Sequence, residues 1–126
     1  MIHLDTSFLI RALARGTSED RDIRTWLTDG TELGISAVCW AEFLCGPVAA
    51  AEVELAGRLL AEPEPFVAAD AIAAAKLFNA SGRRRGSFED SLIAATAMRV
   101  GAGLATANAA DFRRFEKAGL RVIAAR

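Results

Sequence analysis

Residues 87–112, SFEDSLIAATAMRVGAGLATANAADF, show most clearly how helix and strand alternate in this chain. A run of small and apolar side chains follows Ser87 and predicts a helix over Phe88–Val100, with Ser87 as its cap. Gly101 then ends this helix, and the chain passes into a strand over Leu104–Thr106. Because the connection is short, the helix and the strand run antiparallel, and the first turn of the helix lies near the far end of the strand. A helix that returns the chain to a strand in this way is typical of an α/β fold.

The rest of the chain shows the same alternation of short apolar runs and helical runs. The other runs typical of strands are Ile2–Leu4, Leu33–Ile35, Phe66–Val67 and Leu120–Ala124. The other helices are expected at about Phe8–Ala14, Ser18–Asp29, Ala37–Cys45 (capped by Ser36), Val48–Ala61 and Asp70–Ala80, with a short helix capped by Asn108. The pattern predicts an α/β domain in which helices flank a mainly parallel central sheet of four or five short strands.

Size and charge narrow the class of protein further. With 126 residues, of which 52% are hydrophobic, the chain is expected to form a single domain over residues 1–126. A net charge of −1 gives no overall field that would attract nucleic acid. The sequence shows no signal peptide and no apolar run of the roughly 18 residues that span a bilayer. Cys39 and Cys45 are expected to be reduced and buried, so we expect a cytoplasmic protein that does not enter a membrane.

Four acidic residues stand directly after the predicted strands or in early turns of the helices, namely Asp5, Glu42, Asp90 and Asp111. Asp5 follows the first strand, and Asp111 follows the strand at Leu104–Thr106 by one short turn. Glu42 lies on the helix that leaves the second strand, and Asp90 lies in the first turn of its helix. Because parallel strands all end at the same edge of a sheet, we expect the four carboxylates to meet there.

Each carboxylate also has a simpler explanation when it is considered alone. Asp5 is placed to cap a helix, and the segments that contain Asp90 and Asp111 have the spacing of capping boxes. Glu42 stands among apolar residues, where an unpaired charge would be costly. As a group, clustered carboxylates raise one another's pKa until a cation binds, and oxygen ligands favour Mg²⁺ or Mn²⁺. A metal of this kind supports hydrolysis at phosphorus, so metal-dependent phosphate chemistry is the first hypothesis.

Together these motifs resemble the PIN domain, and more closely the VapC-type toxin ribonucleases of bacterial toxin–antitoxin pairs. The resemblance rests on the segments Ile2–Ser7, Ile35–Gly46, Asp90–Ala97, Gly103–Phe112 and Gly119–Ile123. It covers essentially the whole chain, and the combination is specific although each segment alone would be weak. It implies a PIN-like α/β fold and the hydrolysis of RNA phosphodiester bonds by a metal-activated water, which leaves a 5′-phosphate and a 3′-hydroxyl.

The resemblance also implies roles for particular residues. Asp5, Glu42, Asp90 and Asp111 would be the catalytic acids that hold Mg²⁺ or Mn²⁺, with Asp5 and Asp90 as direct ligands and the other two acting directly or through water. Thr106 and Asn108 would orient the site by hydrogen bonding. The expected partners are an RNA substrate, a VapB-type antitoxin protein and a second copy of the chain in a homodimer. Candidates for the protein interfaces are Trp26, Trp40, Phe43 and Leu44, of which at least two are expected to belong to the core.

Arg83, Arg84 and Arg85 depart from the commoner family pattern by crowding the approach to Asp90. They are candidates for contacts with the RNA backbone or for pairing with an acid such as Glu89, and a solvated loop is the alternative. His3 is the only histidine and is expected to be structural, so a ribonuclease that uses two histidines is nearly excluded. The alternative function is a catalytically inert PIN-like module that binds RNA or protein.

Overall fold

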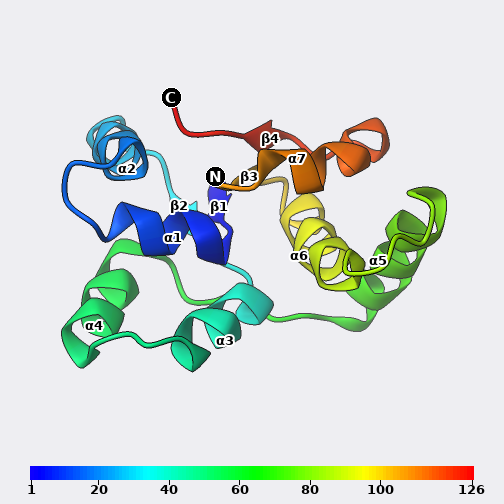
Figure 1. Ribbon diagram of the computed structural model, residues 1–126, viewed down its shortest axis with the longest axis horizontal. Helices are drawn as coiled ribbons and strands as arrows, with labels where there is room; N and C mark the ends of the chain where they lie inside the picture. The colour runs from blue at the N-terminus through cyan, green and yellow to red at the C-terminus, as the bar shows by residue number, and fades with distance from the viewer.

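The computed structural model describes residues 1–126 and has a four-stranded sheet at its centre (Figure 1). The strands are β1 (Ile2–Leu4), β2 (Leu33–Gly34), β3 (Gly103–Ala105) and β4 (Val122–Ile123). Their order in the sheet is β2-β1-β3-β4, and every neighbouring pair is parallel. The predicted α/β fold with a parallel sheet is therefore confirmed, with four strands. All four strands end at the same edge.

Seven α-helices and one 3₁₀-helix surround the sheet. They are α1 (Thr6–Ala12), α2 (Ser18–Thr28), α3 (Ala37–Cys45), α4 (Ala50–Leu59), α5 (Ala68–Ala80), α6 (Phe88–Arg99), α7 (Ala109–Phe112) and η1 (Arg113–Ala118). Helices α1 to α4 lie on the side of β2, whereas α5, α6 and α7 lie on the side of β3 and β4 (Figure 1). None of the helices combines the length and the apolar character needed to cross a lipid bilayer.

The predicted strand at Phe66–Val67 is wrong. The chain instead forms one isolated parallel bridge between Ser36 and Glu64, in which the Glu64 amide donates to the Ile35 carbonyl at 2.8 Å. Glu64 stands between two prolines, Pro63 and Pro65, and a proline has no amide hydrogen to extend a ladder. The residues between Glu64 and the start of α5 accordingly form no strand.

The core is built from side chains of both halves of the chain. Phe8 on α1, Phe43 on α3 and Phe112 on α7 are fully buried, and so is Leu104 of β3. Trp26 stacks on Phe8 with ring centroids 5.5 Å apart, and Trp40 packs on Phe43 at 5.4 Å. The expectation that at least two of the four candidate interface residues belong to the core is therefore confirmed, whereas Leu44 is exposed.

Helix α3 presents one narrow buried face, which explains where its two cysteines lie. Its cap is Ser36, as predicted, because the Ser36 Oγ accepts a hydrogen bond from the Cys39 amide at 3.1 Å. Cys39 and Phe43 are one helical turn apart and are both buried. Cys45 lies off this face and is exposed, so the prediction that it is buried is wrong.

Helix α6 carries Asp90 and is tied to α5 by a buried acid. The Asp70 carboxylate accepts a hydrogen bond from Arg99 Nε at 2.8 Å and a longer one from Thr96 Oγ1 at 3.4 Å. Asp70 is 1% exposed, so this contact fixes the two helices against one another in the interior. Small buried residues on α6, among them Ala94 and Ala97, let the helices approach closely.

Candidate metal centre

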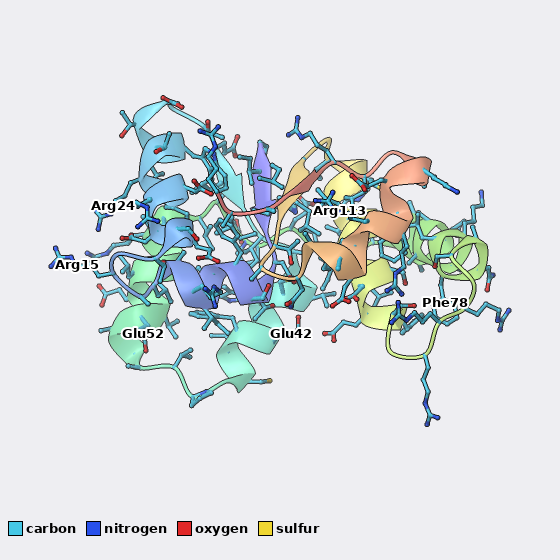
Figure 2. All side chains as sticks on the ribbon, turned by 45° about the horizontal axis from the view of Figure 1, so that its top comes forward. Arg15, Arg24, Glu42, Glu52, Phe78 and Arg113 are labelled. Carbon is cyan, nitrogen blue, oxygen red and sulfur yellow. The ribbon has the colours of Figure 1, made fainter.

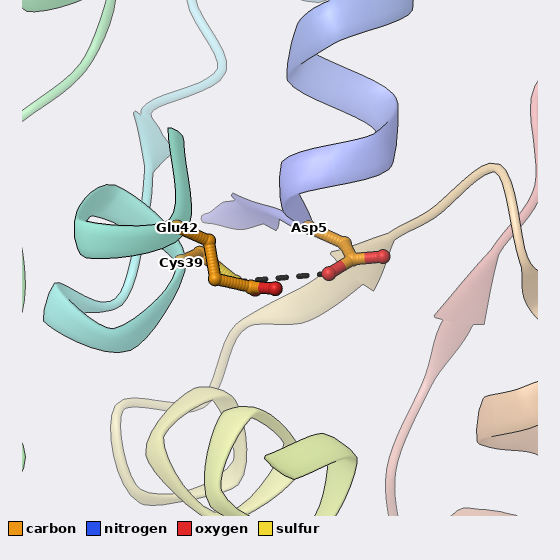
Figure 3. Close-up of side chains that lie close together, drawn as sticks. All are labelled: Asp5, Cys39 and Glu42. Atoms are coloured by element: carbon orange, nitrogen blue, oxygen red, sulfur yellow. Dashed lines mark hydrogen bonds between the residues drawn. The ribbon is translucent and has the colours of Figure 1, made fainter. Parts of the chain in front are cut away.

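Asp5 and Glu42 face one another at the edge where the strands end (Figure 3). Asp5 directly follows β1, and its amide donates to the Ala105 carbonyl at 2.8 Å, which continues the pairing of β1 with β3. Glu42 lies on α3, the helix that follows β2. Carboxylate oxygens of both residues and the Cys39 sulfur lie within 4.8 Å of one another. The parallel sheet thus brings together two acids that are 37 positions apart in sequence.

The Asp5 carboxylate is held by three donors and does not cap α1. Ser7 Oγ and Thr106 Oγ1 each donate to Asp5 Oδ2 at 2.8 Å, and Cys39 Sγ donates to Asp5 Oδ1 at 3.7 Å. Asp5 is 6% exposed, and no amide of α1 donates to its side chain. One oxygen is therefore occupied by two hydroxyl groups, while the other faces Cys39 and Glu42.

Glu42 is oriented by a neighbouring hydroxyl and crowded by other acids. Thr6 Oγ1 donates to Glu42 Oε1 at 2.9 Å. Partial burial raises the pKa of Glu42, the Thr6 hydrogen bond opposes this rise, and the nearby charges of Glu89 and Asp5 add to it. Glu89 is thus a further acid beside the site, and none of the arginines forms an ion pair with it.

Asp90 and Asp111 approach the same edge from the first turns of α6 and α7. Together they line a small polar pocket of about 120 Å³. Burial raises the pKa of Asp90 to about 6, and the negative charges of Asp5, Asp111 and Glu42 add to this rise. All three of the other predicted acids therefore contribute to the raised pKa of Asp90.

The capping explanation of these acids fails in this structure. Neither Ser87 nor Asn108 caps its helix through the side chain, so both predictions of a cap are wrong. Ser87 Oγ donates instead to the Arg84 carbonyl at 2.7 Å, and the backbone conformation of Ser87 is not that of a usual cap. The carboxylates of Asp90 and Asp111 are left free of helix-terminal amides.

The donor set suits a hard divalent cation. No lysine, arginine or histidine forms an ion pair with Asp5, Glu42, Asp90 or Asp111. Cys39 is not a thiolate ligand, because burial and the charge of Asp5 raise the pKa of its thiol to about 12 and it donates to Asp5. What remains is oxygen only, which favours Mg²⁺ or Mn²⁺ over zinc. The residues present therefore fit the metal expected from the sequence.

A frame of hydroxyl groups supports the acids, and the sequence predicts only part of it. Thr106 Oγ1, besides donating to Asp5, accepts from the Asn108 amide at 2.9 Å, and Ser7 Oγ accepts from the Ala107 amide at 3.1 Å. Ser7 and Thr6 were not predicted as site residues, although their position directly after Asp5 was the available signal. The Asn108 side chain is exposed and makes no such contact.

The three arginines before Asp90 do not act as one group. Arg83 donates to the Asn79 side chain at 3.1 Å and lies over the Phe78 ring, and it does not line the pocket of Asp90 and Asp111. Arg84 and Arg85 line the polar pocket of Asp90 and Asp111. In Figure 2, Phe78 lies at one end of the molecule and Arg15 and Arg24 at the other, with Glu42 between them.

Comparisons with known proteins agree with this architecture. A family model described as the PIN domain matches residues 2–118. FitAcB from Neisseria gonorrhoeae is 19% identical, with a TM-score of 0.75 over 98% of this chain and 96% of that chain. VapBC2 from Rickettsia felis, solved with a DNA fragment from its promoter, is 20% identical, with a TM-score of 0.75 over 98% of both chains. DNA-bound VapBC from Salmonella typhimurium is 21% identical, with a TM-score of 0.71 over both full chains. At these identities the likeness shows the fold. No curated protein matches the sequence.

Proposed function

Because this chain belongs to the PIN domain family, we propose that it is a metal-dependent endoribonuclease that acts as the toxin of a toxin–antitoxin pair. The observations that carry this proposal are the Asp5 and Glu42 carboxylates, whose oxygens lie within 4.8 Å, and the pair of Asp90 and Asp111 in the adjoining polar pocket, where the charges of Asp5 and Glu42 raise the pKa of Asp90. None of these four side chains caps a helix or forms an ion pair. An inert module has no reason to keep such a group together, because its members repel one another. The fold shared with the VapBC and FitAB complexes supports the toxin assignment.

The proposed metal is Mg²⁺ or Mn²⁺. Asp5 and Asp90 would bind it directly, and Glu42 and Asp111 would bind directly or through water. When bound, the ion lowers the pKa of a coordinated water and neutralises charge on a phosphate. Ser7 and Thr106 hold the Asp5 carboxylate in one orientation, as hydroxyl groups around a metal ligand commonly do.

One of the protein's own acids would accept the proton of the attacking water. Glu42 is accessible to solvent, is oriented by Thr6 and has a raised pKa, so it is suited to accept that proton. The water oxygen forms a bond to phosphorus while the bond from phosphorus to the 3′-oxygen breaks. The 3′-oxygen takes a proton from solvent, and the products are a 5′-phosphate and a 3′-hydroxyl.

The test of this function is cleavage of total RNA by the purified protein with Mg²⁺ or with EDTA. We expect cleavage with Mg²⁺ and none with EDTA, because removal of the metal leaves mutually repelling acids and no activated water. Cleavage that persists in EDTA would contradict the proposal. Absence of cleavage by folded protein that is free of any antitoxin would favour the alternative, an inert PIN-like module that binds RNA or protein.

We also propose a VapB-type antitoxin as the protein partner, because several solved structures of this fold are toxin–antitoxin complexes. An apolar groove of about 400 Å³ between α1, α2 and α4 is suited to an apolar antitoxin segment, and its lining includes Leu27, Leu55 and Leu59. We expect the protein to be less soluble alone than when it is co-expressed with its antitoxin. Equal yields of soluble protein in the two cases would count against a large shared interface.

A further inference from the structure

A small, entirely polar pocket opens beside the proposed metal centre. Its volume is about 120 Å³, and no hydrophobic side chain lines it. The lining residues are Arg84, Arg85, Gly86, Ser87, Asp90, Asp111 and Arg114. The pocket thus joins two of the four acids to three guanidinium groups that come from two separate segments of the chain.

Among these three arginines, Arg114 has a buried hydrogen-bond donor without an acceptor. Its Nη1 atom is shielded from solvent and has no hydrogen-bond acceptor in the protein. Arg114 stands close enough to Asp90 for its charge to lower the pKa of that acid, yet it forms no ion pair with Asp90 or Asp111. A buried donor without an acceptor is costly, so a ligand that brings acceptors would be favoured here. The guanidinium carbon lies 6.0 Å from the centre of the Phe115 ring, which restrains its position.

The loop before α6 brings the other two arginines to the pocket. Gly82, Arg83 and Gly86 all have positive φ angles, of 92°, 54° and 85°. At Gly86 this conformation would strain any other residue, so glycine is required for the loop to turn into α6 here. Arg83 is held by Asn79 and Phe78, whereas Arg84 and Arg85 are exposed and line the pocket.

We propose that Arg114, together with Arg84 and Arg85, seats a phosphate of the RNA backbone next to the metal centre. This inference deepens the proposed function, on which the choice of RNA as the ligand rests. The two carboxylates of the pocket are proposed to hold the metal, so the positive charges of the three guanidinium groups are available to an anion such as a phosphodiester. The planar guanidinium of Arg114 offers paired donors to two phosphate oxygens, which an ammonium group cannot do in the same way.

The test measures binding of a fluorescently labelled single-stranded RNA of mixed sequence by anisotropy, in a full-length Asp5→Asn background that does not cleave. In this background Arg114→Gln is compared with Arg114→Lys and with the matched control Arg113→Gln. Arg113 is the preceding residue, is exposed and forms an ion pair with Glu116 at 3.3 Å. It lies on the same segment as Arg114 but does not line the pocket. Each titration is repeated at several salt concentrations.

We expect Arg114→Gln to weaken RNA binding about tenfold, Arg114→Lys to weaken it less, and Arg113→Gln to leave it within about twofold. The slope of log affinity against log salt should fall by about 0.7 in Arg114→Gln, the value for one lost phosphate contact on a single strand. Because Arg114 Nη1 has no acceptor and Arg114 forms no ion pair, Arg114→Gln loses only the contact with Phe115 and the attraction to Asp90, so its melting temperature should fall by no more than about 4 °C. A large fall in that temperature would show that the arginine supports the fold and would overturn the inference.

The RNA-binding experiment can fail or succeed independently of the RNA-cleavage experiment. If Arg114→Gln binds RNA as tightly as Arg113→Gln, or if the parent protein binds no RNA, the phosphate seat is wrong even when the wild-type protein cuts RNA. If RNA binding depends on Arg114 while the wild-type protein cleaves no RNA, the phosphate-binding role of Arg114 is supported and the nuclease function is contradicted.

Discussion

Replacing Asp5 with asparagine is expected to lower the rate of Mg²⁺-dependent RNA cleavage by at least about a hundredfold, because a lost direct ligand costs several kcal/mol of metal and transition-state stabilisation. The structure indicates which way the amide would turn. Asp5 Oδ2 accepts hydrogen bonds from Ser7 and Thr106, so the amide oxygen would take that place. The amide nitrogen would then point to the Cys39 and Glu42 side, where the metal is proposed to bind.

The matched control is Asp29→Asn. Asp29 is an exposed carboxylate at the end of α2, and its side chain makes no hydrogen bond or ion pair. Both variants carry the same change of charge, so an effect of net charge on RNA binding would appear in both. Initial rates on total RNA measure the difference. An Asp5→Asn rate within about threefold of wild type, with the metal still required, would mean that Asp5 is not a ligand.

Replacing Asp90 with asparagine is expected to abolish cleavage and, at the same time, to stabilise the metal-free protein at neutral pH. The folded-state pKa of Asp90 is about 6, raised from 3.8, because burial and the neighbouring acids disfavour its charged form. A raised folded-state pKa means that stability from the protonated group is present below about pH 4 and is lost as the pH rises through 6. The wild-type protein without metal should therefore lose stability across this range, and the variant should lose less.

Screening by solvent limits how much stability Asp90→Asn gains in the metal-free protein. Asp90 is only about half-buried, so screening reduces the effect to about 1 kcal/mol, or a melting temperature about 4 °C higher for Asp90→Asn at pH 7 in EDTA. Saturating Mg²⁺ should reverse the order, because it binds the folded wild-type protein and stabilises it by mass action. Thermal melts at pH 4.5 and pH 7, with Mg²⁺ and with EDTA, measure both effects. A variant that is less stable than wild type in EDTA at pH 7 would contradict the account.

Much of the fold follows from local signals in the sequence. The strands at Ile2–Leu4 and Leu104–Thr106 are short apolar runs with a cap or turn residue directly after them, and both form at nearly the predicted bounds. Helix α3 starts after Ser36 as expected, because the serine hydroxyl satisfies an amide of the first turn. The expected strand at Phe66–Val67 does not form, because Pro63 and Pro65 have no amide hydrogen with which to extend the ladder beyond the bridge at Glu64.

The site was less visible in the sequence than the fold. The convergence of Asp5 and Glu42 follows from parallel topology, which a pattern of alternating elements can predict. The hydroxyl contacts of Thr6 and Ser7, the approach of Glu89 to Glu42, and the place of Arg114 depend on side-chain directions and on packing between distant segments. Residue types and spacing carry no information about those directions. Arg114 in particular follows Asp111 in an arginine-rich run that has no recognisable motif.

Calorimetric titration of the purified protein with Mn²⁺ decides whether Asp5, Glu42, Asp90 and Asp111 form one site for a divalent cation. We predict saturable binding at pH 6 that releases protons, because Asp90 must ionise to bind and its pKa is about 6. Asp5→Asn and Asp90→Asn should each weaken this binding by at least about tenfold, whereas Asp29→Asn should not change it. Absence of Mn²⁺ binding to folded wild-type protein, or equal binding by all four proteins, would contradict such a site.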